Sequence, residues 1–261
     1  MSHAAGRQSI FITGAASGMG RETARLFREQ GLFIGAFDVN QAGLDALQAE
    51  LGADNCVIQT LDVSDKAQFD AAVATFGAAT DGRMDILFNN AGIIMRGYFD
   101  EMSFEDQLKI INVNVIGVMN GTHSALPLLK ETPNALCFNT SSSSATMGMP
   151  LIAVYSASKH AVKGLTEAWS NEFKRFDIRC ADALPGLIRT GMTSDEFLAK
   201  APTKGPFRLI EAVEVAKVVW ASYHNEHKLH WYIPEELAEL DKAASNDPEL
   251  LRDKLARNME L

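Results

Sequence analysis

The chain has 261 residues, of which 47% are hydrophobic and 22% charged, so it can bury a large core as an ordinary globular protein. Its formal net charge of −9, with no Lys/Arg block, argues against a nucleic-acid partner or an electrostatic membrane anchor. No apolar stretch approaches the roughly 18 residues of a membrane span, and eight residues before the first apolar run are too few for a signal peptide. Cys56, Cys137 and Cys180 lie in separate apolar runs without metal-ligand spacing, which predicts reduced thiols, a cytoplasmic location and no metal.

Strand-like and helix-like segments alternate along the chain. Short apolar or β-branched runs predict strands at 9–13, 32–38, 56–62, 84–90, 135–141, 178–185 and 228–234. Apolar residues at helical spacing predict helices at 21–31, 40–51 and 67–77, with further long helical segments between the later strands. Strands that are apolar on both faces and separated by helices indicate a parallel sheet covered on both sides. We therefore predict an α/β fold, a single Rossmann-type doubly wound domain over residues 1–261.

A glycine-rich turn, TGAASGMG, joins the first strand to the first helix and places Gly14, Gly18 and Gly20 there. Glycine permits a sharp turn and a close approach to a pyrophosphate, which then lies at the positive end of the helix. Its T-G-x-x-x-G-x-G spacing differs from the common dinucleotide fingerprint. Asp38 ends the second strand, where an acid can bind the ribose hydroxyls of adenosine and repel a 2′-phosphate. The alternative is that Asp38 is only a turn residue before the next helix.

Tyr155 and Lys159 are four residues apart in AVYSASKHA, so they lie on one face of a predicted helix. A phenol with a pKa of about 10 is a poor base at neutral pH, whereas a neighbouring ammonium lowers that pKa toward a working range. Taken alone, the pair could equally be a half-buried aromatic beside a solvated charge.

The order of the motifs resembles a compact short-chain dehydrogenase/reductase from about residue 9 to residue 225. After the glycine turn come Asp62–Val63, NNAG (89–92), NVIG (114–117), NTSSSS (139–144), YSASK (155–159) and PGLIRT (185–190). The resemblance implies hydride transfer between NAD(H) and a secondary alcohol or ketone.

The same resemblance implies a role for each catalytic residue. Tyr155 would be the base for oxidation and the acid for reduction, and Lys159 would lower its pKa and hold the nicotinamide ribose. Ser142 would bond the substrate oxygen, although Ser141, Ser143 and Ser144 beside it make that assignment less certain. Asn114 would support a water linking Lys159 to solvent; otherwise its amide, like those of Asn112 and Asn120, only satisfies local backbone at a kink.

Asp38 favours NAD, because Ser17 and Val39 stand where NADP-preferring relatives commonly carry Arg or Lys. The expected cofactor-binding residues are Gly14, Ser17, Gly18, Met19, Gly20, Asp38, Asp62, Val63, Asn90, Ala91, Gly92, Tyr155, Lys159, Pro185, Gly186, Ile188 and Thr190.

Residues 191–211 fit the mobile lid that covers the substrate in this family. The expected substrate pocket consists of Met95, Ser144, Met149 and Met192. An apolar, methionine-rich pocket favours a hydrophobic or aromatic secondary alcohol or ketone, although such methionines can also be plain core. A sugar or polyol dehydrogenase, a sugar-nucleotide epimerase and a non-catalytic dinucleotide sensor remain as alternatives.

The segment 234–261 departs from the family pattern. Asp247 and Pro248 look like the N-cap and first residue of a last helix, which predicts a helical C-terminal extension. This extension puts the usual homotetramer in doubt, and a homodimer is expected to remain.

Overall fold

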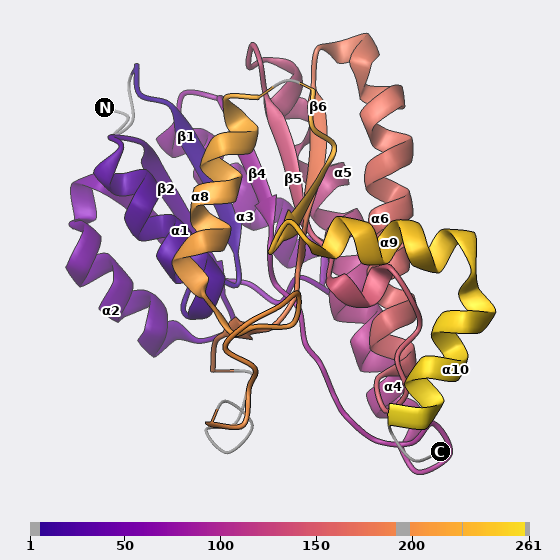
Figure 1. Ribbon diagram of the computed structural model, residues 1–261. Coiled ribbons are helices and arrows are strands. Elements are labelled where there is room, and N and C mark those ends of the chain that lie inside the picture. The colour runs from indigo at the N-terminus through magenta and orange to yellow at the C-terminus, as the bar shows by residue number, and fades with distance from the viewer. Residues whose placement is uncertain (1–5, 192–198, 226, 259–261) are drawn as a thin grey trace.

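The computed structural model describes residues 6–191, 199–225 and 227–258. Seven parallel strands form one sheet in the order β3-β2-β1-β4-β5-β6-β9 (Figure 1). The strands are β1 (Ser9–Thr13), β2 (Phe33–Asp38), β3 (Cys56–Thr60), β4 (Ile86–Asn89), β5 (Leu136–Thr140), β6 (Arg179–Pro185) and β9 (His230–Ile233). A separate two-stranded pair consists of β7 (Ile188–Arg189) and β8 (Ile210–Glu211). The predicted α/β fold is confirmed, and every predicted strand contains an observed one.

The long helices are α1 (Gly18–Glu29), α2 (Gln41–Leu51), α3 (Lys66–Ala79), α4 (Phe104–Ile111), α5 (Gly117–Lys130), α6 (Ala153–Glu172), α8 (Ala212–Tyr223), α9 (Leu237–Asn246) and α10 (Pro248–Asn258). The short ones are η1 (Ala53–Asn55), η2 (Asn112–Ile116), η3 (Ser143–Ala145) and η4 (Phe173–Phe176). Helix α1 begins three residues before its predicted start, because the last residues of the glycine turn already belong to its first turn.

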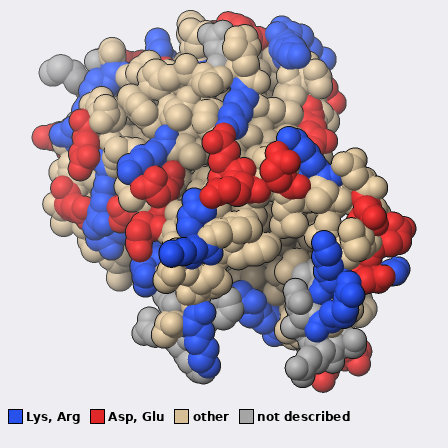
Figure 2. All heavy atoms as spheres, in the orientation of Figure 1, with Lys and Arg blue, Asp and Glu red and all other residues tan. Residues whose placement is uncertain are grey.

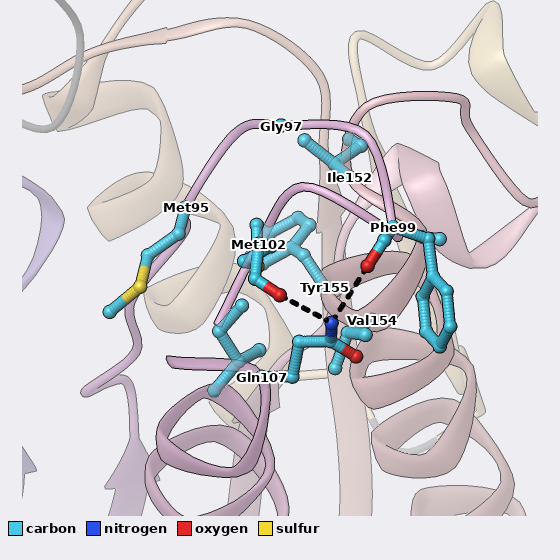
Figure 3. Close-up of a pocket in the computed structure, with 10 residues that line it drawn as sticks. Met95, Gly97, Phe99, Met102, Gln107, Ile152, Val154 and Tyr155 are labelled. Carbon is cyan, nitrogen blue, oxygen red and sulfur yellow. Dashed lines mark hydrogen bonds between the residues drawn. The ribbon is translucent and has the colours of Figure 1, made fainter. Parts of the chain in front are cut away.

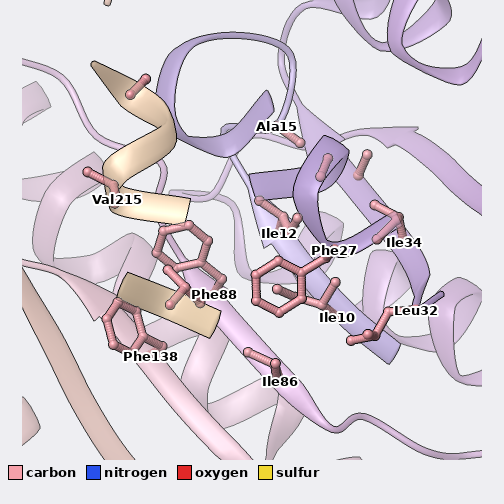
Figure 4. Packing of buried hydrophobic residues seen from close by; sticks show 14 of the residues in the cluster. Ile10, Ile12, Ala15, Phe27, Leu32, Ile34, Ile86, Phe88, Phe138 and Val215 are labelled. Carbon is pink, nitrogen blue, oxygen red and sulfur yellow. The ribbon is translucent and has the colours of Figure 1, made fainter. Parts of the chain in front are cut away.

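Strand β1 shows why the sheet is covered on both faces. All five of its residues are buried, and neighbouring side chains point to opposite faces. Ile10 and Ile12 enter the cluster beneath α1, α2 and α8 (Figure 4), whereas Phe11 enters the cluster beneath α3 and α5. A side chain on Gly35 of β2 would come within 2.4 Å of the Phe76 ring, so a glycine is needed for α3 to pack there.

The strand order reverses between β1 and β4. The chain runs outward from β1 through β2 to β3 and then returns to place β4 on the other side of β1. In a doubly wound sheet the loops after these two strands diverge, which leaves a crevice at the carboxyl ends of the strands. The glycine turn after β1 and the NNAG segment after β4 therefore face one another.

The C-terminal helices lie beyond the β9 edge of the sheet, beside α6 (Figure 1). Lys163 of α6 forms an ion pair with Asp241 of α9 at 2.8 Å, which connects the extension to the helix that carries Tyr155. The Asp247 side chain accepts a hydrogen bond from the backbone amide of Leu250 at 2.9 Å, so its predicted role as N-cap of α10 is confirmed.

Acidic and basic side chains are interspersed on the face drawn in Figure 2, and no field of one sign dominates it. Ion pairs between elements include Arg21 with Glu50 and Arg208 with Glu236. No helix in the described part of the chain is both long and apolar enough to cross a membrane.

Candidate active site

A cleft of about 580 Å³ opens at the point where the strand order reverses. It is lined by Gly14, Ser17, Gly18, Met19, Asp38, Val39, Leu61, Asp62, Val63, Asn90, Ala91, Gly92, Ile93, Lys109, Val113, Thr190 and Gly191. Eleven of the expected cofactor-binding residues are in this set. The other six, Gly20, Tyr155, Lys159, Pro185, Gly186 and Ile188, do not line the cleft.

Glycine in the turn is required by the geometry. Gly14 and Gly18 have positive φ angles of 66° and 52°, which L side chains rarely adopt. A Cβ on Gly20 would lie 2.1 Å from the carbonyl oxygen of Gly14, so Gly20 acts by letting α1 pack under the turn rather than by lining the cleft. No side chain in the described part of the chain caps the first turn of α1 at Ser17. The free backbone N–H groups at the start of α1, and the positive end of the helix dipole, suit an anion.

The two loops that face each other are joined by Thr13 and Asn90. The Thr13 hydroxyl accepts hydrogen bonds from the backbone amides of Asn90 and Ala91, each at 3.0 Å. The Asn90 side chain donates to the carbonyl oxygen of Thr13 at 2.9 Å. These bonds fix the floor of the cleft before any ligand enters.

Asp38 holds the local backbone and also lines the cleft, and its expected contact with an adenosine ribose remains a prediction. One carboxylate oxygen accepts the backbone amide of Ala16 in the glycine turn at 3.0 Å, and the other accepts that of Asn40 at 2.9 Å. Asn40, not Asp38, is the N-cap of α2. The half-buried Asp38 carboxylate thus braces the turn and also lines the cleft.

Tyr155 and Lys159 share one face of α6, as their spacing predicted. The Lys159 ammonium nitrogen lies 5.7 Å from the centre of the Tyr155 ring. It is almost fully buried and donates a hydrogen bond to the carbonyl oxygen of Thr140 at 2.8 Å. Ser142, two residues beyond Thr140, lies close enough to the Tyr155 phenol to act on its pKa. The end of β5 and the start of α6 therefore bring the three groups together.

The pKa values differ from the expectation based on the sequence. Burial raises the pKa of Tyr155, and only a hydrogen bond from Ser142 and the positive charge of Arg96 act to lower it. Burial also lowers the pKa of Lys159 from its ordinary 10.5 to about 8. The prediction that Lys159 lowers the pKa of Tyr155 is therefore wrong for this structure. The physical reason is that a water-poor site disfavours both the phenolate and the ammonium.

Asn114 lies in the π-helical turn between α4 and α5, and its side chain is fully buried. Its amide oxygen accepts the backbone amide of Ile93 at 2.8 Å, and its amide nitrogen donates to the Ile93 carbonyl at 2.9 Å. The same nitrogen donates to the Ser158 hydroxyl at 3.0 Å. The side chain thus clamps the loop after β4 to α6, and its proposed part in a proton relay remains a prediction.

The hydroxyls beside Ser142 have distinct surroundings. Ser141 donates to the carbonyl oxygen of Lys159 at 3.0 Å, which holds α6 against β5. The Ser144 hydroxyl is buried and has no hydrogen-bond partner among the described residues. Because Ser142 is the serine that acts on the pKa of Tyr155, it is the best placed of the four for contact with a substrate oxygen.

A small apolar pocket lies against Tyr155 (Figure 3). It is lined by Met95, Gly97, Phe99, Met102, Gln107, Ile110, Ile152, Ala153, Val154 and Tyr155. Of the expected pocket residues Met95 is present, Ser144 and Met149 are not part of the lining, and Met192 lies outside the described residues.

Sequence reasoning missed most of this pocket and several residues of the cleft. Phe99, Met102 and Gln107 belong to a loop and a helix that carry no motif of their own. Leu61, Ile93, Lys109, Val113 and Gly191 line the cleft beside recognised motifs. Closeness in sequence to NNAG and Asp62–Val63 was the signal that could have found Leu61 and Ile93.

Comparisons with known proteins agree with this geometry. The family model described as short chain dehydrogenase matches residues 8–201. The chain is 34% identical over 232 residues to a levodione reductase of Leifsonia aquatica, which covers 80% of this chain and 85% of the relative. It is 31% identical over 223 residues to a cyclohexanol dehydrogenase of Acinetobacter sp. strain SE19, covering 84% and 88%.

A solved structure extends the agreement to the fold. The crystal structure of a short chain dehydrogenase/reductase from Burkholderia phymatum in complex with NAD has a TM-score of 0.82 to this chain, at 26% identity, covering 94% of this chain and 95% of that one. The chain therefore belongs to the short-chain dehydrogenase/reductase family. It is an enzyme of that oxidoreductase family, as the motifs predicted.

Proposed function

We propose that this enzyme transfers a hydride between NAD(H) and a hydrophobic secondary alcohol or ketone. The observation that carries the proposal is the convergence of Ser142, Tyr155 and Lys159 beside a cleft whose glycine turn and uncapped helix suit a dinucleotide.

Tyr155 transfers the proton. Oxidation requires loss of the hydroxyl proton of the alcohol, so the Tyr155 phenolate accepts it, and the phenol returns it in the direction of reduction. The Ser142 hydroxyl bonds the same substrate oxygen and orients it toward Tyr155. Because the Ser142 side chain is nearly buried at the end of a strand, it holds this position without a large loss of entropy on binding.

Lys159 binds the ribose hydroxyls on the nicotinamide side. Its ammonium can exchange the Thr140 carbonyl for a ribose oxygen without leaving the buried site. Gly92 leaves the room for this, since a Cβ there would lie 3.4 Å from the Lys159 nitrogen and 3.2 Å from the Asn114 amide oxygen. Asn114 supports a water that carries protons between Lys159 and solvent.

NAD(H) is the cofactor, and when bound it supplies the hydride acceptor or donor. The Asp38 carboxylate accepts hydrogen bonds from the adenosine ribose and repels a 2′-phosphate. The uncapped N-terminus of α1 binds the pyrophosphate. The similar structure from Burkholderia phymatum, which holds NAD, supports this choice.

The substrate is apolar around its reacting carbon. The pocket against Tyr155 is lined mainly by Met95, Phe99, Met102 and Ile152, which cannot satisfy the hydroxyls of a sugar. The similarity to a cyclohexanol dehydrogenase supports a cyclic or aromatic secondary alcohol.

We also propose the domain organisation, the oligomeric state and the location of the enzyme. Residues 1–261 form one catalytic domain and residues 234–261 are a helical extension, while the expected substrate lid at 191–211 lies partly outside the described residues. The active form is a homodimer or homotetramer in the cytoplasm.

A panel of substrates tests the proposal. Cyclic, aryl and open-chain secondary alcohols and polyols are offered with NAD and separately with NADP, and formation of the reduced cofactor is followed by absorbance. We expect NAD to be preferred and the cyclic or aryl alcohols to show the largest kcat/KM. A polyol that exceeds every hydrophobic alcohol would overturn the substrate class, and an absence of turnover with both cofactors would overturn the reaction.

A further inference from the structure

The helical run from α4 through η2 to α5 carries three amide side chains that each hold a different loop. Gln107 holds the loop before α4, Asn114 holds the segment after β4, and Asn120 holds the segment after β3. These three loops surround the site on different sides. One helical run therefore connects the substrate pocket with both ends of the cofactor cleft.

Gln107 fixes the wall of the substrate pocket. Its amide nitrogen donates hydrogen bonds to the carbonyl oxygens of Phe99 at 2.9 Å and Met102 at 3.1 Å, as the dashed lines in Figure 3 show. The side chain is nearly buried and itself lines the pocket with Tyr155. On the other side of the loop, the backbone amide of Gly97 donates to the carbonyl of Leu151 at 2.9 Å.

The loop also contains its own turn, in which the backbone amides of Glu101 and Met102 donate to the carbonyl oxygen of Tyr98, each at 3.1 Å. Phe99 is 66% exposed, so packing against the protein contributes little to holding its backbone. The two hydrogen bonds from Gln107 attach this turn to α4 and so help to fix the positions of Phe99 and Met102.

Asn120 fixes the opposite end of the site. Its amide nitrogen donates to the carbonyl oxygens of Val63 at 3.0 Å and Ser64 at 3.3 Å. One turn earlier, Gly117 allows close contact, since a Cβ there would lie 2.6 Å from a Val63 methyl carbon. The Val63 side chain is buried against α5, and Asp62 and Val63 line the cofactor cleft.

We propose that Gln107 and Asn120 are positioning residues with separate effects, Gln107 on the substrate and Asn120 on the cofactor, at the part of the cleft that Asp62 and Val63 line. The inference rests on the proposed function, because it assigns the loop held by Gln107 to the substrate and the segment held by Asn120 to the cofactor. A purely structural role would make both residues affect stability alone, or affect substrate and cofactor together. Separate effects follow because each amide bonds to a single loop and the two loops line different cavities.

Two nearly isosteric variants test the proposal in the full-length enzyme. Gln107→Met and Asn120→Leu remove the donor and keep the approximate size, and Glu105→Gln is a matched control at an exposed position of α4. Dissociation constants for NADH and for ADP-ribose are measured by fluorescence and by competition. KM and kcat are measured at saturating NAD with the alcohol that has the largest kcat/KM in the wild type.

We expect each variant to change a different set of constants. Gln107→Met should raise KM for the alcohol about tenfold, which corresponds to about 1.4 kcal/mol, and leave both dissociation constants within about twofold. Asn120→Leu should raise both dissociation constants about tenfold and leave KM within about twofold. Glu105→Gln should change none of these constants. Equal shifts of KM and the NADH dissociation constant in one variant would overturn the separation of roles, as would no shift in either variant.

Hydrogen exchange provides a second readout that does not depend on turnover. Faster exchange should be confined to residues 97–103 in Gln107→Met and to residues 61–65 in Asn120→Leu. Exchange that spreads through both loops in either variant would contradict the proposal. A wild type that neither binds NADH nor oxidises any alcohol would overturn the proposed function itself, and the exchange pattern would then still decide whether each amide holds its own loop.

Discussion

Replacing Lys159 with methionine should make the cofactor-free protein more stable at neutral pH while it abolishes function. Methionine has nearly the same length and shape but carries no charge. Lys159 is only 3% exposed, and burial lowers its pKa from 10.5 to about 8. Since one pKa unit corresponds to about 1.4 kcal/mol, holding the ammonium in the folded protein at pH 7 costs about 3 kcal/mol.

The net gain is smaller, because the variant leaves the Thr140 carbonyl without its hydrogen bond from Lys159. That loss is about 1 to 2 kcal/mol, so the free energy of unfolding at pH 7 should rise by about 2 kcal/mol in Lys159→Met.

The pH dependence is the sharper part of the prediction. Between pH 8 and 10.5 the unfolded wild type binds more protons than the folded wild type, so wild-type stability rises with pH relative to the variant. The cost of the buried ammonium should fall from about 3 kcal/mol at pH 7 to about 2 kcal/mol at pH 9. The advantage of the variant should therefore shrink by about 1 kcal/mol over this range.

Urea unfolding without cofactor, at one protein concentration and at both pH values, measures this difference. Lys204→Met, at an exposed position, is the control and should show no such change. If the difference between wild type and Lys159→Met stayed constant from pH 7 to pH 9, the ammonium would not be destabilised by burial and the reasoning would be refuted.

Other predictions concern the reaction and the cleft. Tyr155→Phe should lower kcat by at least about a hundredfold, because it removes the proton-transfer group. The NADH dissociation constant should stay near that of the wild type. Substantial remaining turnover would exclude Tyr155 as the base. Alcohol oxidation should rise with pH from about 7 to 9 without a plateau and ketone reduction should fall, because burial raises the pKa of Tyr155 and only its phenolate accepts a proton. A plateau within that range, with chemistry rate-limiting, would show that the pKa is lowered in the working complex. Asp38→Ser should narrow the preference for NADH over NADPH in fluorescence titrations, and equal affinities already in the wild type would contradict the role of Asp38. Gly20→Ala should abolish cofactor binding or folding, since the alanine Cβ would lie 2.1 Å from the Gly14 carbonyl oxygen. Normal NADH affinity in a folded variant would count against the close packing of the turn.

The order of elements and the main motifs were predictable from the sequence because each depends on residues close together in the chain. Alternating apolar runs and helical spacing predicted the parallel sheet, and the glycine spacing predicted the turn after β1. The four-residue interval between Tyr155 and Lys159 sufficed to place both on one helical face. Asp247 capped the last helix as predicted, because capping is a local hydrogen bond.

Only the tertiary structure decided the environment of these groups. The pKa of Tyr155 depends on how deeply α6 packs beside the end of β5, and that burial outweighs the effects of Ser142 and Arg96. Lys159 donates to Thr140, nineteen residues earlier in the chain, which no spacing rule predicts. The pocket wall at Phe99 and Met102 is likewise held by an amide on a separate helix. Residue types and local spacing thus determined which groups could be predicted for the site. Packing between distant segments decided how those groups are charged and held, because desolvation and hydrogen bonding depend on neighbours that only the folded chain brings together.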